Sequence, residues 1–245
     1  AYSEIERKEP WLDNVESVAD IAVLSQEALF YHMNPGNPSP GRLSWMGTTG
    51  ASRILLEGKY LFDVVDTEGD FGKYKLIILT DDSMLDGETA EKLKAFTEGG
   101  GKILASGTSG LYADGSGFAF DLGAEFNGEC EYNPAYIRPE FEMEGLYNSA
   151  YDIYQPCYDI DATGEVLAVR ENPYFNRTTF HFSSHAQTPN DPTKTYPAVT
   201  LGEDGAYISF KLFTEYALKG SLIAKRVVEH VIDVLLGDEK TLTTN

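Results

Sequence analysis

The chain has 245 residues, of which 42% are hydrophobic and 12% aromatic. These are enough apolar side chains to build the core of one large domain, and they exclude global disorder. Its 39 acidic and 19 basic residues give a formal net charge of −20, and such a surface repels phosphate backbones and anionic lipids, so neither nucleic acid nor a membrane is an expected partner.

Two strands and a helix are predicted in the first part of the chain. Residues 1–18 are mostly polar and are predicted to form a connector. The apolar run at 20–25 predicts a first buried strand. Residues 32–41 contain three prolines and two glycines, which predict a loop. A helix over 43–57 and a short strand over 62–66 follow.

The most regular stretch runs from residue 75 to residue 110. Residues 75–80 are a continuous apolar run, typical of a strand buried on both faces of a parallel sheet. Asp86 is positioned to cap a helix over 87–98, and 102–105 supplies the next strand. This alternation predicts an α/β fold: a doubly wound, mainly parallel sheet in three layers, with helices on both faces.

The second half of the chain is less regular. Gly, Tyr, Asn, Pro and acidic residues dominate 111–161, which predicts either an irregular excursion or short edge strands. A final amphipathic helix is predicted over 222–236, followed by an exposed polar tail at 238–245. Further strands are predicted over 165–169, 177–182, 197–201 and 206–210, the last two as a hairpin.

Cysteine usage and hydropathy exclude several kinds of site. Cys130 and Cys157 are the only cysteines and form no C-x-x-C motif, so neither a disulfide framework nor a zinc site is expected. Cys157 is predicted to be a small buried residue. No run of about 18 apolar residues predicts a membrane span, and no signal-peptide pattern is present. Both ends of the chain read as connectors cut from a longer protein, so the missing signals say little about compartment. A bacterial cytoplasmic location is the expectation.

The turn at 106–110 is the first candidate site, because open α/β sheets bind ligands at the carboxyl ends of central strands. It contains the hydroxyls of Ser106, Thr108 and Ser109 but no cysteine. A hydroxyl nucleophile needs a well-placed base, and none lies nearby in the sequence. A turn kept for its backbone shape is therefore the favoured interpretation.

The histidines are the second candidate. His181 and His185 share a face with Ser183 if the strand at 177–182 continues. A two-histidine metal site needs a third ligand that the spacing does not provide, so no metal is expected, and no cofactor motif is present. A hydrogen-bonded structural role is favoured, with a binding or interface role as the alternative. His32 is expected in the loop at 32–41.

Asp81 and Asp82 follow the strand at 75–80 and are the third candidate. Paired carboxylates perform acid–base chemistry in glycosidases. Adjacent residues of a strand point to opposite faces, however, so these two are not expected to converge on one bond. They are predicted to be loop or helix-capping acids that make polar contacts at the sheet edge.

Several segments together resemble a known family, the β-galactosidase trimerisation domain. This is the amidotransferase-like middle domain of certain multidomain glycoside hydrolases. The similarity extends over about residues 9–240. Residues 172–185 resemble the branch of this family whose members are attached to α-L-fucosidase or β-galactosidase-like barrels. The segments that carry the similarity are 19–25, 51–56, 62–66, 99–110, 172–185 and the opening Glu9-Pro10-Trp11-Leu12.

The resemblance implies a flavodoxin-like domain, similar to class I glutamine amidotransferases, over residues 19–237. It also implies that 1–18 is a linker from an upstream catalytic barrel and that 238–245 is a linker stub. In this family the glycosidase carboxylates lie on a (β/α)8 barrel, which this chain is too short to contain. The implied role is a non-catalytic accessory domain in carbohydrate metabolism, whose partners are that barrel and other copies of the parent enzyme in a homo-oligomer.

The chain departs from active amidotransferases at the turn, where the cysteine is absent. The resemblance therefore implies a vestigial site, in which the turn and the histidine segment meet at the carboxyl edge of the sheet. Its candidates are Ser106, Thr108, Ser109, His181 and His185.

Two alternatives remain open. A free-standing amidotransferase-like or trehalose-utilisation-like hydrolase would use Thr108 or Ser109 with His185. A carbohydrate-binding module would use the Tyr-rich region 131–158 as its stacking surface.

Overall fold

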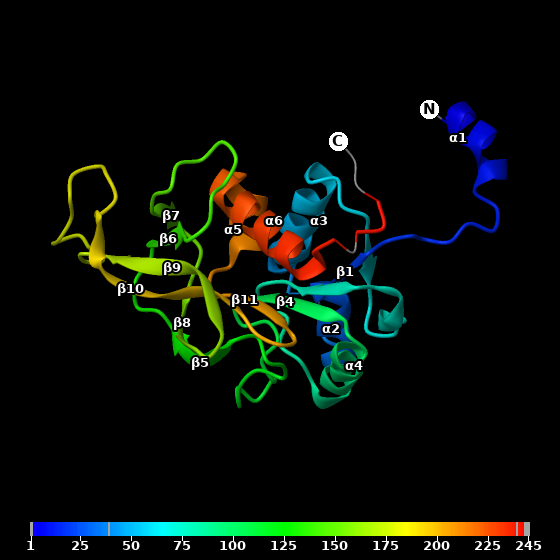
Figure 1. The fold of residues 1–245 in the computed structure, drawn as a ribbon, viewed down its shortest axis with the longest axis horizontal. Coiled ribbons are helices and arrows are strands. Elements are labelled where there is room, and N and C mark those ends of the chain that lie inside the picture. Colours follow the sequence, from blue (N-terminus) through cyan, green and yellow to red (C-terminus); the bar gives the residue numbers. More distant parts are fainter. Residues whose placement is uncertain (1, 39, 239, 243–245) are drawn as a thin grey trace.

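The computed structural model describes residues 2–38, 40–238 and 240–242. Within this part of the chain, nine strands form one mixed sheet in the order β2-β1-β3-β4-β11-β10-β9-β6-β7 (Figure 1). The parallel strands are β2 (Phe62–Val65), β1 (Ile21–Leu24), β3 (Leu76–Leu79), β4 (Lys102–Ser106) and β11 (Gly205–Ile208). The antiparallel extension consists of β10 (Asn190–Leu201), β9 (Glu165–Pro173), β6 (Ala135–Pro139) and β7 (Tyr151–Ile153).

Helices cover both faces of the parallel part, which confirms the predicted three-layer α/β fold. On one face lie α3 (Met46–Glu57), α5 (Leu212–Lys219) and α6 (Leu222–Leu236), and on the other α2 (Gln26–Met33) and α4 (Gly87–Glu98) (Figure 1). Strand residues alternate between two apolar cores, so Ile21 and Val23 face α3 and α6 while Ala22 and Leu24 face α2 and α4. Short 3-10 helices lie in the connections: η1 (Glu9–Trp11), η2 (Arg42–Trp45) and η3 (Phe71–Lys73).

Region 111–161 contains short strands, so the second of the two predicted forms is confirmed. β6 and β7 end the main sheet, and β5 (Ala124–Glu129) pairs antiparallel with β8 (Tyr158–Ala162) in a separate ribbon.

Three helices were not predicted from the sequence. α1 (Tyr2–Lys8) lies within the expected connector, and none of its residues is buried. Figure 1 shows it standing away from the sheet. α2 begins at a Ser25 cap, whose hydroxyl accepts a hydrogen bond from the Ala28 N–H, and it places His32 in a helix and not in the loop. α5 also has no counterpart in the prediction.

The predicted strand at 177–182 is wrong, because this segment lies in the loop 174–189 between β9 and β10. Thr178 closes a tight turn there. Its hydroxyl accepts from the N–H of Phe180 and the N–H of His181, and its own N–H donates to the His181 carbonyl over 2.8 Å. A backbone closed on itself in this way cannot join a ladder.

The polar tail does not simply extend into solvent. The Thr241 N–H and hydroxyl donate to the Asp20 carboxylate over 2.8 and 2.6 Å, which places the chain after α6 beside the start of β1. Residues 239 and 243–245 of the predicted stub lie outside the described residues. Among the described residues, no helix is long and apolar enough to cross a membrane.

The contact between α3 and α5 requires a glycine. Gly50 lies in α3 directly against the backbone of α5, and a Cβ at this position would stand 1.9 Å from the Phe213 carbonyl oxygen. The missing side chain lets the two helices approach backbone to backbone.

Candidate functional site

The carboxyl ends of β1, β3, β4 and β11 meet at one edge of the sheet, where the fold class places its ligands. The turns that follow these strands carry mostly polar residues. Five of the sequence-predicted candidates lie here: Asp81, Asp82, Ser106, Thr108 and Ser109. At this edge the turns after β3 and β4 form a dense internal hydrogen-bond network.

Asp81 is the centre of this network and is fully buried. Its carboxylate accepts hydrogen bonds from the Ser106 hydroxyl over 2.8 Å, from the Thr214 N–H over 2.7 Å and from the Thr214 hydroxyl over 2.5 Å. Thr214 lies in the first turn of α5, so Asp81 caps a helix that is distant in sequence. Burial raises the pKa of Asp81 to about 6, against the opposing effect of the bonds from Thr214 and Ser106.

The turn at 106–110 has the shape of a nucleophile turn, but its backbone donors are already used. The N–H groups of Gly107, Thr108, Ser109 and Gly110 donate to the carbonyls of Ile208, Asp81, Ser106 and Ser83, respectively, over 2.7–3.1 Å. An oxyanion hole needs N–H groups that point at the reacting atom. The turn as folded offers none of these four.

Gly107 explains how tightly this turn is packed. Its φ of +60° favours glycine, and a Cβ would stand 2.4 Å from the Asp81 carbonyl oxygen. On the other side, the Tyr207 hydroxyl donates to the Gly107 carbonyl over 2.5 Å. The loop after β3 and the strand β11 therefore clamp the turn.

The hydroxyls of the turn are also engaged. Ser106 and Ser109 are fully buried, and the Ser109 hydroxyl accepts from the Ser83 N–H over 3.1 Å. Thr108 is partly exposed, with its hydroxyl 3.4 Å from an Asp82 oxygen, and the Lys211 ammonium lies 2.6 Å from the same carboxylate. Asp82 is thus an acid of the sheet edge that is paired with lysine.

The histidine segment does not meet the turn, which corrects the expectation that the two approach each other. His181 and His185 are exposed in the loop 174–189, and His181 stacks on Phe175 with ring centroids 3.7 Å apart. Val199 of β10 pairs with Ile208 at the end of β11, so the preceding residues of β10 run on past the sheet edge. They carry the loop to the far end of the molecule (Figure 1).

The other histidines have separate contacts. His32 Nε2 lies 3.1 Å from the Asp86 carboxylate, and His230 stacks on Phe141. In the described part of the chain, no hydrogen bond or ion pair joins a histidine to the turn. The same residues contain no group of three or more His, Cys, Asp or Glu arranged to hold a metal ion.

We expect a fluorophosphonate probe to leave Thr108 and Ser109 unlabelled in the purified chain. The reasons are that no described histidine contacts Thr108, that the Asp82 carboxylate beside it is paired with Lys211, and that the four N–H groups that would stabilise an oxyanion are engaged. Peptide mass spectrometry measures the labelling, with Thr108→Ala as the matched control. An adduct on either residue that His185→Ala abolishes would contradict this prediction and establish the hydrolase alternative.

Sequence reasoning missed a groove beside this edge. It has a volume of about 370 Å³, and its lining includes Leu29, Phe30 and Met33 of α2 together with Trp45 and Asp82. The Phe30 and Trp45 rings pack 5.6 Å apart, centroid to centroid. The groove depends on α2, so the signal that could have found it was the Ser25 cap in front of that helix.

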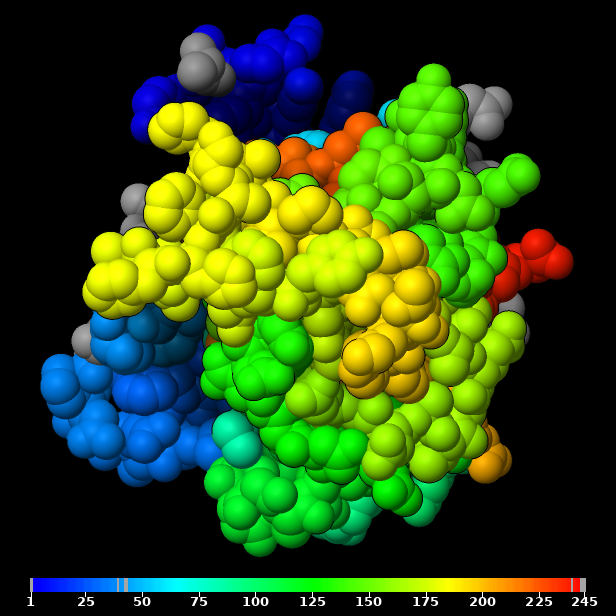
Figure 2. All heavy atoms as spheres, turned by 90° about the vertical axis from the view of Figure 1, so that its left-hand side faces the viewer, coloured from blue at the N-terminus to red at the C-terminus, as the bar shows by residue number. Residues whose placement is uncertain are grey.

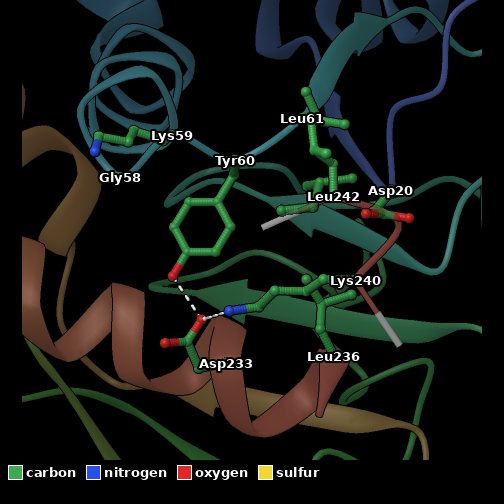
Figure 3. Close-up of a pocket in the computed structure, with 10 residues that line it drawn as sticks. Asp20, Gly58, Lys59, Tyr60, Leu61, Asp233, Leu236, Lys240 and Leu242 are labelled. Carbon is green, nitrogen blue, oxygen red and sulfur yellow. Dashed lines mark hydrogen bonds and ion pairs between the residues drawn. The ribbon is translucent and has the colours of Figure 1, made fainter. Parts of the chain in front are cut away.

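Figure 3 shows a second hollow, of about 180 Å³, at the opposite edge of the sheet. The Tyr60 hydroxyl donates to Asp233 over 2.7 Å, and the Lys240 ammonium lies 2.6 Å from the same oxygen. Burial, followed by this hydrogen bond, raises the pKa of Tyr60. Because these polar groups satisfy one another, we interpret the hollow as a structural junction between α6, the C-terminal segment and β1.

Comparison with known proteins gives one family match. The family model of the β-galactosidase trimerisation domain matches residues 53–117, which extend from the second half of α3 past the turn after β4. A search of curated proteins finds no match.

Solved structures match over most of the chain. The α-L-fucosidase isoenzyme 2 from Paenibacillus thiaminolyticus is 39% identical, with a TM-score of 0.88 over 99% of this chain and 36% of the fucosidase. A β-galactosidase from Bacillus circulans sp. alkalophilus is 18% identical, with a TM-score of 0.65 over 99% of this chain and 35% of that enzyme. A β-galactosidase from Rahnella sp. R3 is 18% identical, with a TM-score of 0.57 over 88% and 31%. The β-galactosidases show the shared fold alone, and the chain spans about a third of the length of each of these enzymes.

Proposed function

Because residues 53–117 match the β-galactosidase trimerisation domain of glycoside hydrolases, we propose that this chain is a non-catalytic accessory domain that holds enzyme subunits together. In this proposal residues 19–237 form the accessory domain, 1–18 link it to an upstream catalytic barrel, and 238–245 begin a second linker. Glycoside hydrolysis takes place on that barrel. A reducing compartment such as the bacterial cytoplasm suits the free thiols of Cys130 and Cys157.

The observation that carries this proposal is the closed hydrogen-bond network at the sheet edge. The position that holds the nucleophile in active relatives of this fold has its backbone donors bonded inside the protein. Asp81, the buried acid beside it, caps α5. A domain whose ligand edge is closed in this way is suited to act through its outer surface.

The loop 174–189 is the part of that surface best suited to hold a partner. Phe180 is 98% exposed, and Tyr174 and Phe182 are also exposed. Figure 2 shows the segment, in yellow, as a ridge on the face that it occupies. A net charge of −20 on each copy opposes association, and apolar contacts of this kind act against that repulsion. We propose that the loop contacts a neighbouring subunit and forms a wall of its sugar-binding cleft.

We expect the double variant Phe180→Ser, Phe182→Ser to weaken assembly of the full-length protein at least tenfold in Kd, because both rings lose a dry contact. Sedimentation velocity over a range of concentrations measures the change. Tyr147→Ser is the matched control, since Tyr147 is 88% exposed on a different loop. Wild-type assembly by the double variant, or equal weakening by the control, would contradict the role of this loop.

A further inference from the structure

Cys130 and Cys157 lie opposite each other where the β5–β8 ribbon ends. Glu129 pairs with Tyr158 as the last pair of this ribbon, and Cys130 and Cys157 are the next residues outward on the two chains, with Cys157 bridged to Phe210 on its other side. The Cys130 N–H donates to the Cys157 carbonyl over 2.9 Å, which holds the two backbones together at this point. A direct backbone hydrogen bond between two cysteines brings them near enough for a disulfide to link them.

The surroundings make the two sulfurs chemically different. The Tyr132 N–H donates to the Cys130 sulfur over 3.4 Å, whereas the Cys157 thiol lies 3.8 Å from the Tyr132 carbonyl as a donor. The neighbouring Cys157 thiol, the Tyr132 N–H and the charge of Arg170 lower the pKa of Cys130 to about 7, against the opposing effect of burial. The hydrogen bond to Cys130, followed by burial, raises the pKa of Cys157.

Solvent exposure also distinguishes the two cysteines, and Cys130 is again the more reactive of the two. Cys130 is 8% exposed and Cys157 is 1% exposed, so a small reagent reaches Cys130 first. Arg170 is buried beside the pair and keeps its charge, because it is paired with Asp159 and donates to the Tyr158 carbonyl over 2.9 Å. The site thus combines an attacking thiolate, a neighbouring thiol and a fixed cation, the arrangement that thiol oxidation requires.

We propose that Cys130 and Cys157 form a reversible oxidation site for small hydroperoxides. The Cys130 thiolate attacks the peroxide, a sulfur–oxygen bond forms, the O–O bond breaks, and hydroxide or alkoxide leaves. The Cys157 sulfur then displaces the sulfenic hydroxyl, which leaves as water with the Cys157 proton, and a disulfide forms. The peroxide is reduced by two electrons and the two thiols are oxidised.

A disulfide between Cys130 and Cys157 would restrict the movement of the segment between them. Residues 131–156 lie between the two cysteines and carry β6 and β7, which end the main sheet. Oxidation would therefore hold this edge of the sheet to the β5–β8 ribbon, whether or not the assembly role proposed above is correct.

The test is peroxide treatment of the purified chain, read by intact mass and peptide mapping. We expect the loss of two hydrogens, a peptide linking Cys130 to Cys157, a fall from two free thiols to none, and reversal by dithiothreitol. The initial rate should rise about tenfold from pH 6 to pH 8, as the thiolate of a group with pKa near 7 forms. Disulfide formation only between chains, or oxidation to sulfinic acid without a bridge, would overturn the proposal.

Single variants separate the two roles. In Cys157→Ser, dimedone should trap a sulfenic acid on Cys130, and in Cys130→Ser the labelling of Cys157 should be at least tenfold slower. Equal labelling of both, or faster labelling of Cys157, would show that the order is wrong. If either variant fails to fold, as judged by circular dichroism, the linked peptide from the oxidised wild-type chain still decides whether the site exists.

Discussion

Replacing Gly50 by alanine should lower the free energy of unfolding by about 3 kcal/mol, because overpacking against a rigid neighbour forces backbone movement. The added Cβ would stand 1.9 Å from the Phe213 carbonyl oxygen and 2.6 Å from its carbonyl carbon. These are backbone atoms of α5, so no side chain can rotate away. α3 and α5 would have to move apart, and both belong to the apolar core on that face of the sheet.

Gly87→Ala is the matched control, since it places the same methyl group in another helix. Gly87 is the first residue of α4, and nothing lies within 4 Å of the point that its methyl group would occupy. Alanine there should raise the free energy of unfolding by about 0.5 kcal/mol through the unfolded state. Urea unfolding followed by circular dichroism measures both variants. If the two glycines respond alike, the close approach of α3 to α5 is not what requires Gly50.

Removal of the Asp81 carboxylate should have a similarly large effect. Asp81→Ala leaves the Ser106 hydroxyl, the Thr214 hydroxyl and the Thr214 N–H without their acceptor in a buried place. At about 1 kcal/mol or more for each donor, we expect a loss of about 3 kcal/mol. Denaturant unfolding at pH 7 measures this loss. A change below about 1 kcal/mol would mean that water replaces the carboxylate.

The titration of Asp81 gives this prediction a second, independent readout. Its pKa is raised to about 6 in the folded protein, from about 3.9 in an unfolded chain. Between these values the folded state binds more protons than the unfolded state, so the contribution of Asp81 to stability falls as the pH rises from 4 to 6. The full difference amounts to about 3 kcal/mol.

The variant Asp81→Asn isolates the pH-dependent contribution of Asp81 to stability. Asparagine has nearly the same side-chain shape as aspartate, does not titrate, and tolerates the φ of +46° at this position. The free energy difference between wild type and variant should shift by about 2 kcal/mol between pH 4 and pH 7, with the wild type relatively more stable at pH 4. Other carboxylates titrate equally in both proteins and cancel. A difference that does not change with pH would show that Asp81 keeps an ordinary pKa.

The parallel core could be predicted because its signals are local. The apolar runs of β1, β3 and β4 identify them as buried strands. The predicted cap of α4 is present, with the Thr89 N–H donating to Asp86 over 2.7 Å. Each of these elements is specified by residues within a few positions of it.

α5 could not be predicted in the same way. Its own N-cap residue, Lys211, provides no side-chain hydrogen bond, and the carboxylate that caps it comes from Asp81, 133 positions earlier. α2 had a local signal in Ser25 that was not used, and the loop predicted from the prolines at 35, 38 and 40 overlaps only its last residues. A cap supplied by the tertiary structure leaves no pattern in the helix that it stabilises.

The position of the candidate site could be predicted from the sequence, but the occupation of its hydrogen-bond donors could not. The sequence placed a turn of small residues after a central strand, and the turn is there. The groups that occupy its N–H donors come from β11 and the loop after β3, which only the fold brings together. The histidines were assigned to a strand because Phe180 and Phe182 suggested period-two burial, whereas these rings are exposed beyond the Thr178 turn.

The contact of Thr241 with Asp20 has a mechanical consequence. It brings the chain that leaves α6 to the point where the chain enters β1. The segment that precedes β1 and the segment that follows α6 therefore leave the folded part of the chain at nearly the same place. A pulling force applied between these two segments would act first on the two hydrogen bonds between Thr241 and Asp20. These bonds would break, and the C-terminal segment would detach, before any strand left the sheet.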